Sequence, residues 1–186
     1  MSVSSYEALT DAAKDAGADD IRKGTDQAAG GDATALPAQT REQRPELIVE
    51  ALARECNRKT ARDGFDALNG IDRIILTVAS VDHELSNGGF EQWFTNAEDW
   101  ILACAVDALQ RIGCERSAEI TQQAIDALGL DVPLTSRGIA SALSRENADR
   151  DTTLSVCNDV FYAAAEPLAA KLLAFIEDAS ASATHP

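Results

Sequence analysis

Helical periodicity runs through this chain from Glu46 almost to its end, and it limits the fold more than any other feature. Ile71, Ile75 and Val78 fall on one helix face, because they are separated by four and three residues. No segment shows the apolar-polar alternation that predicts a half-buried strand. With short connections, this pattern predicts an all-α fold, a compact bundle of six or seven helices with antiparallel neighbours.

Prolines and glycines mark where individual helices should begin and end. Pro45 suits the first position of a helix, and a last helix should begin near Pro167. Gly113 is a typical residue just after a helix end. Weaker helical patterns cover residues 135–147 and 151–165.

One further helix is expected to begin at Asn96. Asp99 follows three residues later, and the two resemble a capping pair. The periodicity of this helix points five residues inward, namely Trp100, Ile101, Cys104, Ala108 and Ile112.

The first 44 residues differ from the rest in composition. Residues 1–44 are rich in Ala, Asp, Gly, Gln and Thr, and their single aromatic residue is Tyr6. Such a segment buries too little apolar surface to offset its chain entropy, so we expect a low-complexity, mostly disordered, mobile arm. A short helix over Tyr6–Ala16 is the one element it could hold. The helical domain should span 45–178, followed by a frayed tail over 179–186.

The chain is strongly acidic, with 31 acidic and 16 basic side chains and a formal net charge of −15. Such a surface repels phosphate backbones and anionic membranes and attracts basic partners over about 8 Å at physiological salt. Direct nucleic-acid or membrane binding is therefore not expected. Solubility alone, or the acidic surface of a halophilic protein with few lysines, would give the same balance.

Neither a signal peptide nor a membrane span is recognisable in the sequence. The four cysteines form no Cys-x-x-Cys pair and lie among apolar residues, so we expect them to be buried, free thiols. A reducing, cytoplasmic setting fits this pattern.

The stretch SNGGFEQWFTN, residues 86–96, predicts a corner between helices. Asn87 and Gly88 can adopt positive φ and end the preceding helix, and Gly89 permits close backbone approach. Gln92 and Asn87 are expected to satisfy loose backbone groups at this corner. One turn of helix after the glycines brings three rings onto one surface, those of Phe90, Trp93 and Phe94.

Asp82 shares the apolar face of the preceding helix, where an ionised carboxylate needs hydrogen bonds or a raised pKa. We expect the amides of the glycine turn to supply those bonds. The alternative is a metal or acid-base site built from Asp82, His83, Glu84 and Glu91. Because the ligand spacings of known metal helices are absent, we predict no catalytic residue, no metal ligand and no cofactor.

The same stretch resembles a bacterial family of acidic DNA-mimic proteins, long filed as a domain of unknown function. Its pattern is matched by Glu84, Asn87, Gly88, Gly89, Phe90, Gln92, Trp93, Phe94 and Asn96. The resemblance covers roughly Pro45 to Asp178. It implies an all-helical fold, often paired as a homodimer. In the DNA mimic it also implies carboxylates displayed like phosphates, which occupy the DNA-binding surface of a transcription factor.

Acidic residues between Asp82 and Asp131 could form such a surface, since this segment contains ten acidic residues and only two arginines. Five of them project from helices opposite the apolar faces and are the candidate partner-binding residues, Asp99, Asp107, Glu115, Glu119 and Asp126. DNA carries about one charge per 1.7 Å of axis, so several helices must combine to match it. The first helix differs, because Arg54, Arg58 and Arg62 repeat every four residues.

Three functions remain open from the sequence. The first is an acidic module that docks on a basic protein, in particular a DNA-binding regulator. The second is an immunity protein or antitoxin that covers a basic toxin by the same electrostatics. The third is the metal-dependent enzyme described above.

Overall fold

The computed structural model describes residues 44–130 and 134–183, which form seven α-helices and one short 3-10 helix without a β-strand. The all-α prediction is therefore confirmed. The predicted arm over residues 1–44, with its helix at Tyr6–Ala16, lies outside the described residues except for its last position.

Helix α2, Pro45–Asp63, begins where the sequence predicts. Pro45 occupies the first turn, and Gly64 ends the helix with φ +85°. Four residues at helical spacing are buried along one face, Ile48, Val49, Leu52 and Cys56. A 3-10 helix, η2 (Phe65–Ala67), then leads into the next helix.

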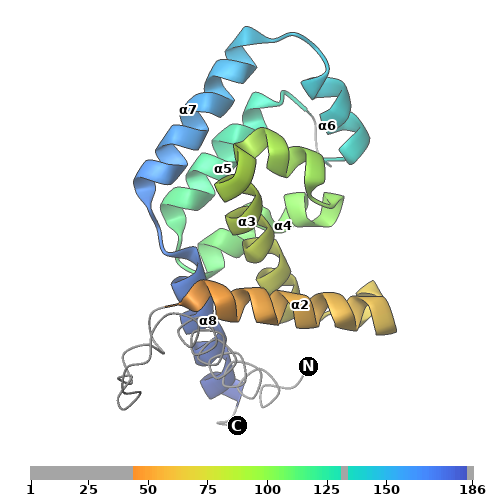
Figure 1. Ribbon diagram of the computed structural model, residues 1–186, viewed down its shortest axis with the longest axis vertical. Coiled ribbons are helices and arrows are strands. Elements are labelled where there is room, and N and C mark those ends of the chain that lie inside the picture. Colours follow the sequence, from red (N-terminus) through yellow and green to blue (C-terminus); the bar gives the residue numbers. More distant parts are fainter. Residues whose placement is uncertain (1–43, 131–133, 184–186) are drawn as a thin grey trace, which may run out of the picture.

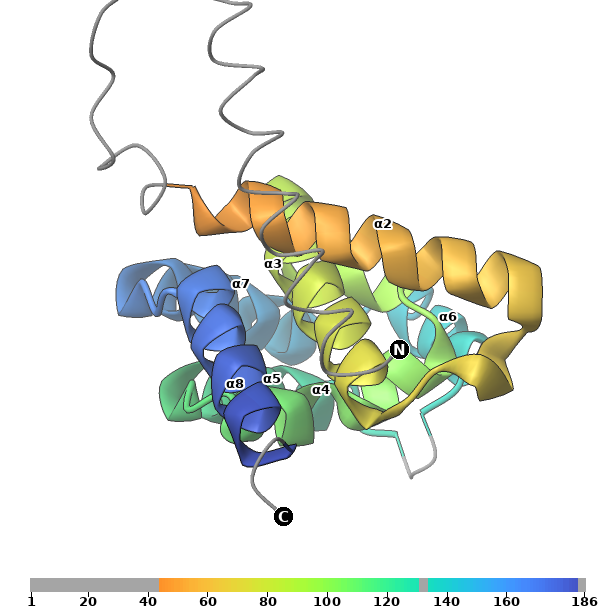
Figure 2. The same ribbon diagram turned by 90° about the horizontal axis from the view of Figure 1, so that it is seen from below.

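Helix α3, Gly70–Asn96, is the centre of the fold, since it contacts α2, α4, α6, α7 and α8. Figure 1 shows α2 lying across one end of the bundle, beside α8, with α6 at the opposite end. Figure 2 shows α3 between α2 and the layer that contains α4 and α5.

Helices α4 (Asp99–Arg111) and α5 (Glu115–Ala127) pack side by side. The predicted start of α4 at Asn96 is wrong, because Asn96 is the last residue of α3 and Glu98 precedes the first residue of α4. Cys104 is exposed, contrary to its predicted inward position. The predicted Ile101, Ala108 and Ile112 are buried, and the buried face also includes Leu102, Ala105 and Leu109.

Three helices complete the chain, α6 (Ser136–Leu143), α7 (Ala148–Ala164) and α8 (Leu168–Ala183). Thr135 and Asn147 cap α6 and α7 through their side chains. Helix α8 continues five residues past the domain end predicted at 178, and Ser180 is buried on it. The tail expected over 179–186 is thus helical as far as Ala183.

A buried ion pair joins α2 to α3. Lys59 Nζ lies 2.6 Å from Asp72 Oδ2, with 11 % and 0 % of the two side chains exposed. Asp72 also accepts hydrogen bonds from the Asn69 amide, 2.9 Å away, and from the Cys56 thiol, 3.5 Å away. Burial, reinforced by the Asp72 carboxylate, raises the pKa of Cys56 to about 12, so its thiol is unreactive.

The junction between α7 and α8 contains Ala165, the one non-glycine residue with positive φ among the described residues. Its φ of 47° and ψ of 36° are left-handed, a conformation that costs an L-residue about 1–2 kcal/mol. We expect Ala165→Gly to raise the free energy of unfolding by about 0.5–1 kcal/mol. Urea denaturation measures this, with Ala163→Gly inside α7 as a control of opposite sign. An Ala165→Gly variant no more stable than wild type would contradict the expected relief.

Candidate functional site

The stretch over residues 86–96 holds a break in α3. At Gly89 the backbone leaves the helix with φ +74° and ψ −167°, and a Cβ atom there would lie 2.6 Å from the side chain of Asn158. Only glycine tolerates this combination. The corner therefore falls one residue after the predicted Asn87–Gly88 stop, and the helix resumes until Asn96.

Two side chains of α7 bind the backbone at this break. The Phe90 amide donates to Asn158 Oδ1 at 2.9 Å, and the Tyr162 hydroxyl donates to the Leu85 carbonyl. Asn158 and Tyr162 are four residues apart and so lie on one face of α7. Sequence reasoning missed both residues. Their four-residue spacing could have indicated two polar side chains on the same face of one helix.

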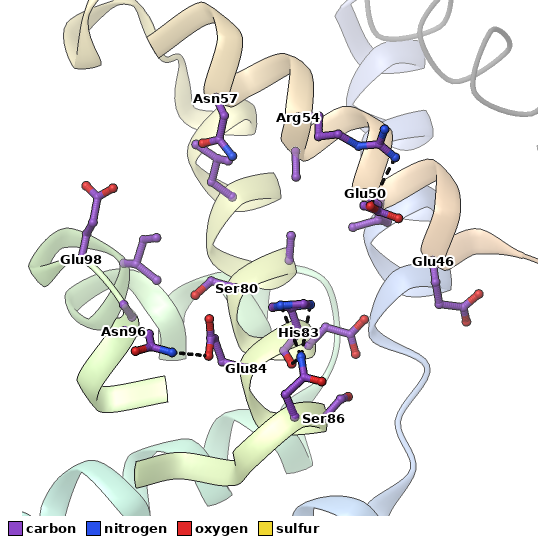
Figure 3. Close-up of a pocket in the computed structure, with 18 residues that line it drawn as sticks. Glu46, Glu50, Arg54, Asn57, Ser80, His83, Glu84, Ser86, Asn96 and Glu98 are labelled. Atoms are coloured by element: carbon purple, nitrogen blue, oxygen red, sulfur yellow. Dashed lines mark hydrogen bonds and ion pairs between the residues drawn. The ribbon is translucent and has the colours of Figure 1, made fainter. Parts of the chain in front are cut away.

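A carboxylate bridges the two halves of α3. Glu84 Oε2 accepts hydrogen bonds from Gln92 Nε2 at 2.8 Å and from Asn96 Nδ2 at 2.9 Å, the second of which is drawn in Figure 3. The backbone role predicted for Gln92 is thus wrong. Asn87 does satisfy a backbone group, since its Nδ2 donates to the His83 carbonyl at 2.8 Å.

The three aromatic side chains of the stretch form the core beside the break. Phe90, Trp93 and Phe94 are 0 %, 0 % and 1 % exposed, and their ring centroids lie 5.2–6.2 Å apart. Phe161 on α7 adds an edge-to-face contact with Phe90 at 5.9 Å. The predicted common surface is confirmed. We therefore propose that these aromatic and hydrogen-bonding residues serve the fold.

Asp82 is half-buried on α3, but the glycine turn does not satisfy it as expected. The Phe90 amide is bonded to Asn158 instead. Burial raises the pKa of Asp82, and nearby Glu46 raises it further, while His83 opposes the shift. The carboxylate that is fully buried is Asp72, which the sequence reasoning did not single out.

Removing the charge of Asp82 should stabilise the fold at neutral pH. A raised folded-state pKa means that the ionised form is disfavoured in the folded protein, so this penalty is present at pH 7. It disappears as the pH falls through the raised pKa to below the ordinary value of 3.8. Asp82→Asn should therefore unfold at a higher urea concentration than wild type at pH 7, with the difference closing in acid. A gain that persists unchanged in acid would contradict this cause, and Glu91→Gln, an exposed carboxylate on α3, is the control.

The candidate partner-binding residues lie on the surfaces of α4 and α5. Glu115, Glu119 and Asp126 are exposed, opposite buried residues of α5. Three of the five candidates contact a side chain of their own helix: Asp107 pairs with Arg111 at 2.8 Å, Glu119 pairs with Arg116 at 3.0 Å, and Asp126 accepts a hydrogen bond from Gln122 at 2.7 Å.

Asp99 has a structural contact. Its Oδ1 accepts a hydrogen bond from the Ser136 amide at 2.7 Å and another from the Ser136 hydroxyl, which ties α4 to the first turn of α6. These hydrogen bonds lower the pKa of Asp99. It is nevertheless exposed.

A groove of about 620 Å³ runs between α2, α3 and the start of α4. Of the described residues that line it, Arg54 is the one lysine or arginine. Five others carry carboxylates, namely Glu46, Glu50, Asp82, Glu84 and Glu98. Figure 3 shows side chains of α2 on one wall and Ser80, His83, Glu84 and Glu98 across from them. Sequence reasoning did not find this groove.

The groove also tests the alternative metal site. It brings together Asp82, His83 and Glu84, whereas Glu91 does not line it. Among the described residues, no group of three or more His, Cys, Asp or Glu side chains is arranged to hold a metal ion.

No helix in the described part of the chain is both long enough and apolar enough to cross a membrane.

Comparison with known proteins places the helical domain in a family. The pattern of the DMP19-like protein family matches residues 66–179. The chain belongs to this family, which is a family of DNA mimics. The match begins at η2, later than the Pro45 start that the resemblance implied, so α2 lies outside it. Neither the curated proteins nor the solved structures contain a match.

Proposed function

We propose that this protein is an acidic interaction module that occupies the basic DNA-binding surface of another protein. Family membership supports this role, because the family includes DNA mimics. One structural observation carries it: carboxylates stand on the exposed faces of packed helices, with Glu115, Glu119 and Asp126 opposite the buried side of α5. A packed helix holds such charges at fixed positions, as a rigid phosphate backbone does.

The charge pattern favours a protein partner over a nucleic acid. The arginines of α2 do not form a free basic face, since Arg54 pairs with Glu50, Arg58 with Glu55 and Arg62 with Asp63. A basic DNA-binding surface supplies the positive charge that these acidic faces lack. The module needs no cofactor for this role.

The test is affinity capture by the full chain from an extract of its native host at low salt, with the bound proteins identified by mass. We expect a basic DNA-binding protein whose affinity falls steeply as salt rises. Capture of a toxin encoded beside this gene would replace the proposal with an immunity role. Binding that is insensitive to salt, or partners that are not basic, would contradict it.

A further inference from the structure

The groove between α2 and α3 combines an apolar floor with an acidic rim. Val49, Leu76 and Ile101 are buried lining residues, from α2, α3 and α4 respectively, and Ala53 and Ala79 are partly buried lining residues. Lining residues on α2 run from Glu46 to Asn57, about 17 Å at 1.5 Å per residue, or about three helical turns. The groove can therefore accept an extended row of side chains.

The carboxylates of the rim, Glu46, Glu50, Asp82, Glu84 and Glu98, are poorly neutralised by the residues that the structure describes. Arg54 is the one arginine among the described residues that line the groove, and its guanidinium lies 3.3 Å from Glu50. Glu84 and Glu98 accept hydrogen bonds from uncharged groups, the latter from the Trp100 indole at 2.8 Å. Cations from another molecule would offset this excess of negative charge.

The geometry points to one occupant: we infer that the α2–α3 groove receives a basic amphipathic helix of a protein partner. Apolar side chains at spacings of three, four and seven residues would cover the floor, and flanking Lys or Arg side chains would meet the rim carboxylates. That the partner is a DNA-binding protein rests on the proposed function. The inference adds the surface and the kind of segment that docks there.

The position of Asp82 also supports this occupant. Asp82 faces the groove half-buried next to Glu46, and an incoming cation would relieve the electrostatic cost that its burial imposes. Helix α2, which forms one wall, lies outside the residues that match the family. The groove is therefore a property of this chain that the family match does not assign.

The test uses a fluorescent peptide of roughly three to four helical turns. It carries leucine at positions spaced by three and four and lysine or arginine on the flanking positions. Its control has the same composition in a scrambled order. Anisotropy titrations with the full chain should give at least about tenfold tighter binding of the ordered peptide, because only its helix presents one apolar face. Equal binding of both peptides would overturn the inference.

Matched variants locate the binding surface. The groove variant combines Glu46→Gln, Asp82→Asn and Glu98→Gln, and leaves Glu84 intact because it bridges α3. The stripe variant combines Glu115→Gln, Glu119→Gln and Asp126→Asn, which changes the net charge equally. We expect the groove variant to raise the Kd of the ordered peptide at least about tenfold and the stripe variant by less than about twofold. Equal losses, or a larger loss in the stripe variant, would overturn the inference.

A measurement on the wild-type protein removes any dependence on how the variants fold. Amide chemical shifts recorded during peptide titration should change in α2 and around residues 76–87 and 96–101, and changes confined to α5 would overturn the inference. These peptide experiments can fail or succeed independently of the capture experiment that tests the proposed function. A peptide in the groove without a captured DNA-binding protein would refute only the function, and a captured protein held by the stripe would refute only the groove.

Discussion

Lys59→Met should lower the free energy of unfolding by about 3–5 kcal/mol, because it removes the buried cation that Asp72 contacts at 2.6 Å. The methionine can fill much of the space of the lysine stem, so the loss reports mainly on charge. Urea denaturation at neutral pH measures it.

Two further variants identify the cause of that loss. Arg58→Met removes an exposed cation from the same helix and should change the stability by less than about 1 kcal/mol. The double variant Lys59→Met/Asp72→Asn should recover part of the loss, since it also removes the buried negative charge of Asp72 that Lys59 balances. A single Lys59→Met variant as stable as wild type would contradict a stabilising contact between α2 and α3.

Gly89→Ala should have the second large effect. The residue would be strained at φ +74°, and its Cβ would meet Asn158 at 2.6 Å and displace the partner of the Phe90 amide. Backbone strain and a lost partner for a buried amide each cost about 1–3 kcal/mol, so we expect a destabilisation of about 3 kcal/mol. Thermal or urea unfolding of the variant measures this.

Gly70→Ala is the matched control for the variant at Gly89. A Cβ at Gly70 meets no atom within 4 Å, and Gly70 has no positive φ. The control should stay within about 0.5 kcal/mol of wild type or gain slightly in stability. If the two alanine variants were equally stable, the break in α3 would not require glycine.

Much of the fold could be predicted because it depends on local spacing. Helix α2 follows from its proline start at Pro45 and from a buried face at three- and four-residue intervals. The contact of Phe90, Trp93 and Phe94 follows from the same geometry. Such features need no knowledge of what packs against the helix.

The remaining features depend on partners distant in sequence. Asp72 is buried because Lys59 reaches it from another helix, although the pattern of Asn69 and Asp72 could have indicated the capping box that the structure contains. Cys104 lies on a helix face that no neighbour covers, which its apolar surroundings in sequence could not indicate. The acidic groove likewise arises where α2 crosses α3 and the start of α4.

The acidic surface has two parts with different local neutralisation. On α4 and α5, Asp107 and Glu119 each pair with an arginine one turn away, so their net field is reduced. In the groove, the described lining residues include five carboxylates and a single arginine, Arg54. A basic partner would therefore gain most from the groove, while α4 and α5 would contribute to longer-range attraction.

Competition between this protein and duplex DNA for one captured partner tests the central claim most directly. A fluorescent duplex bound to that partner would be titrated with the full chain, and the anisotropy of the duplex followed. If the chain occupies the DNA-binding surface, it releases the duplex completely. The chain concentration that releases half of the duplex then rises as the duplex concentration is raised. A ternary complex, in which the duplex remains bound at saturating chain, would contradict the claim.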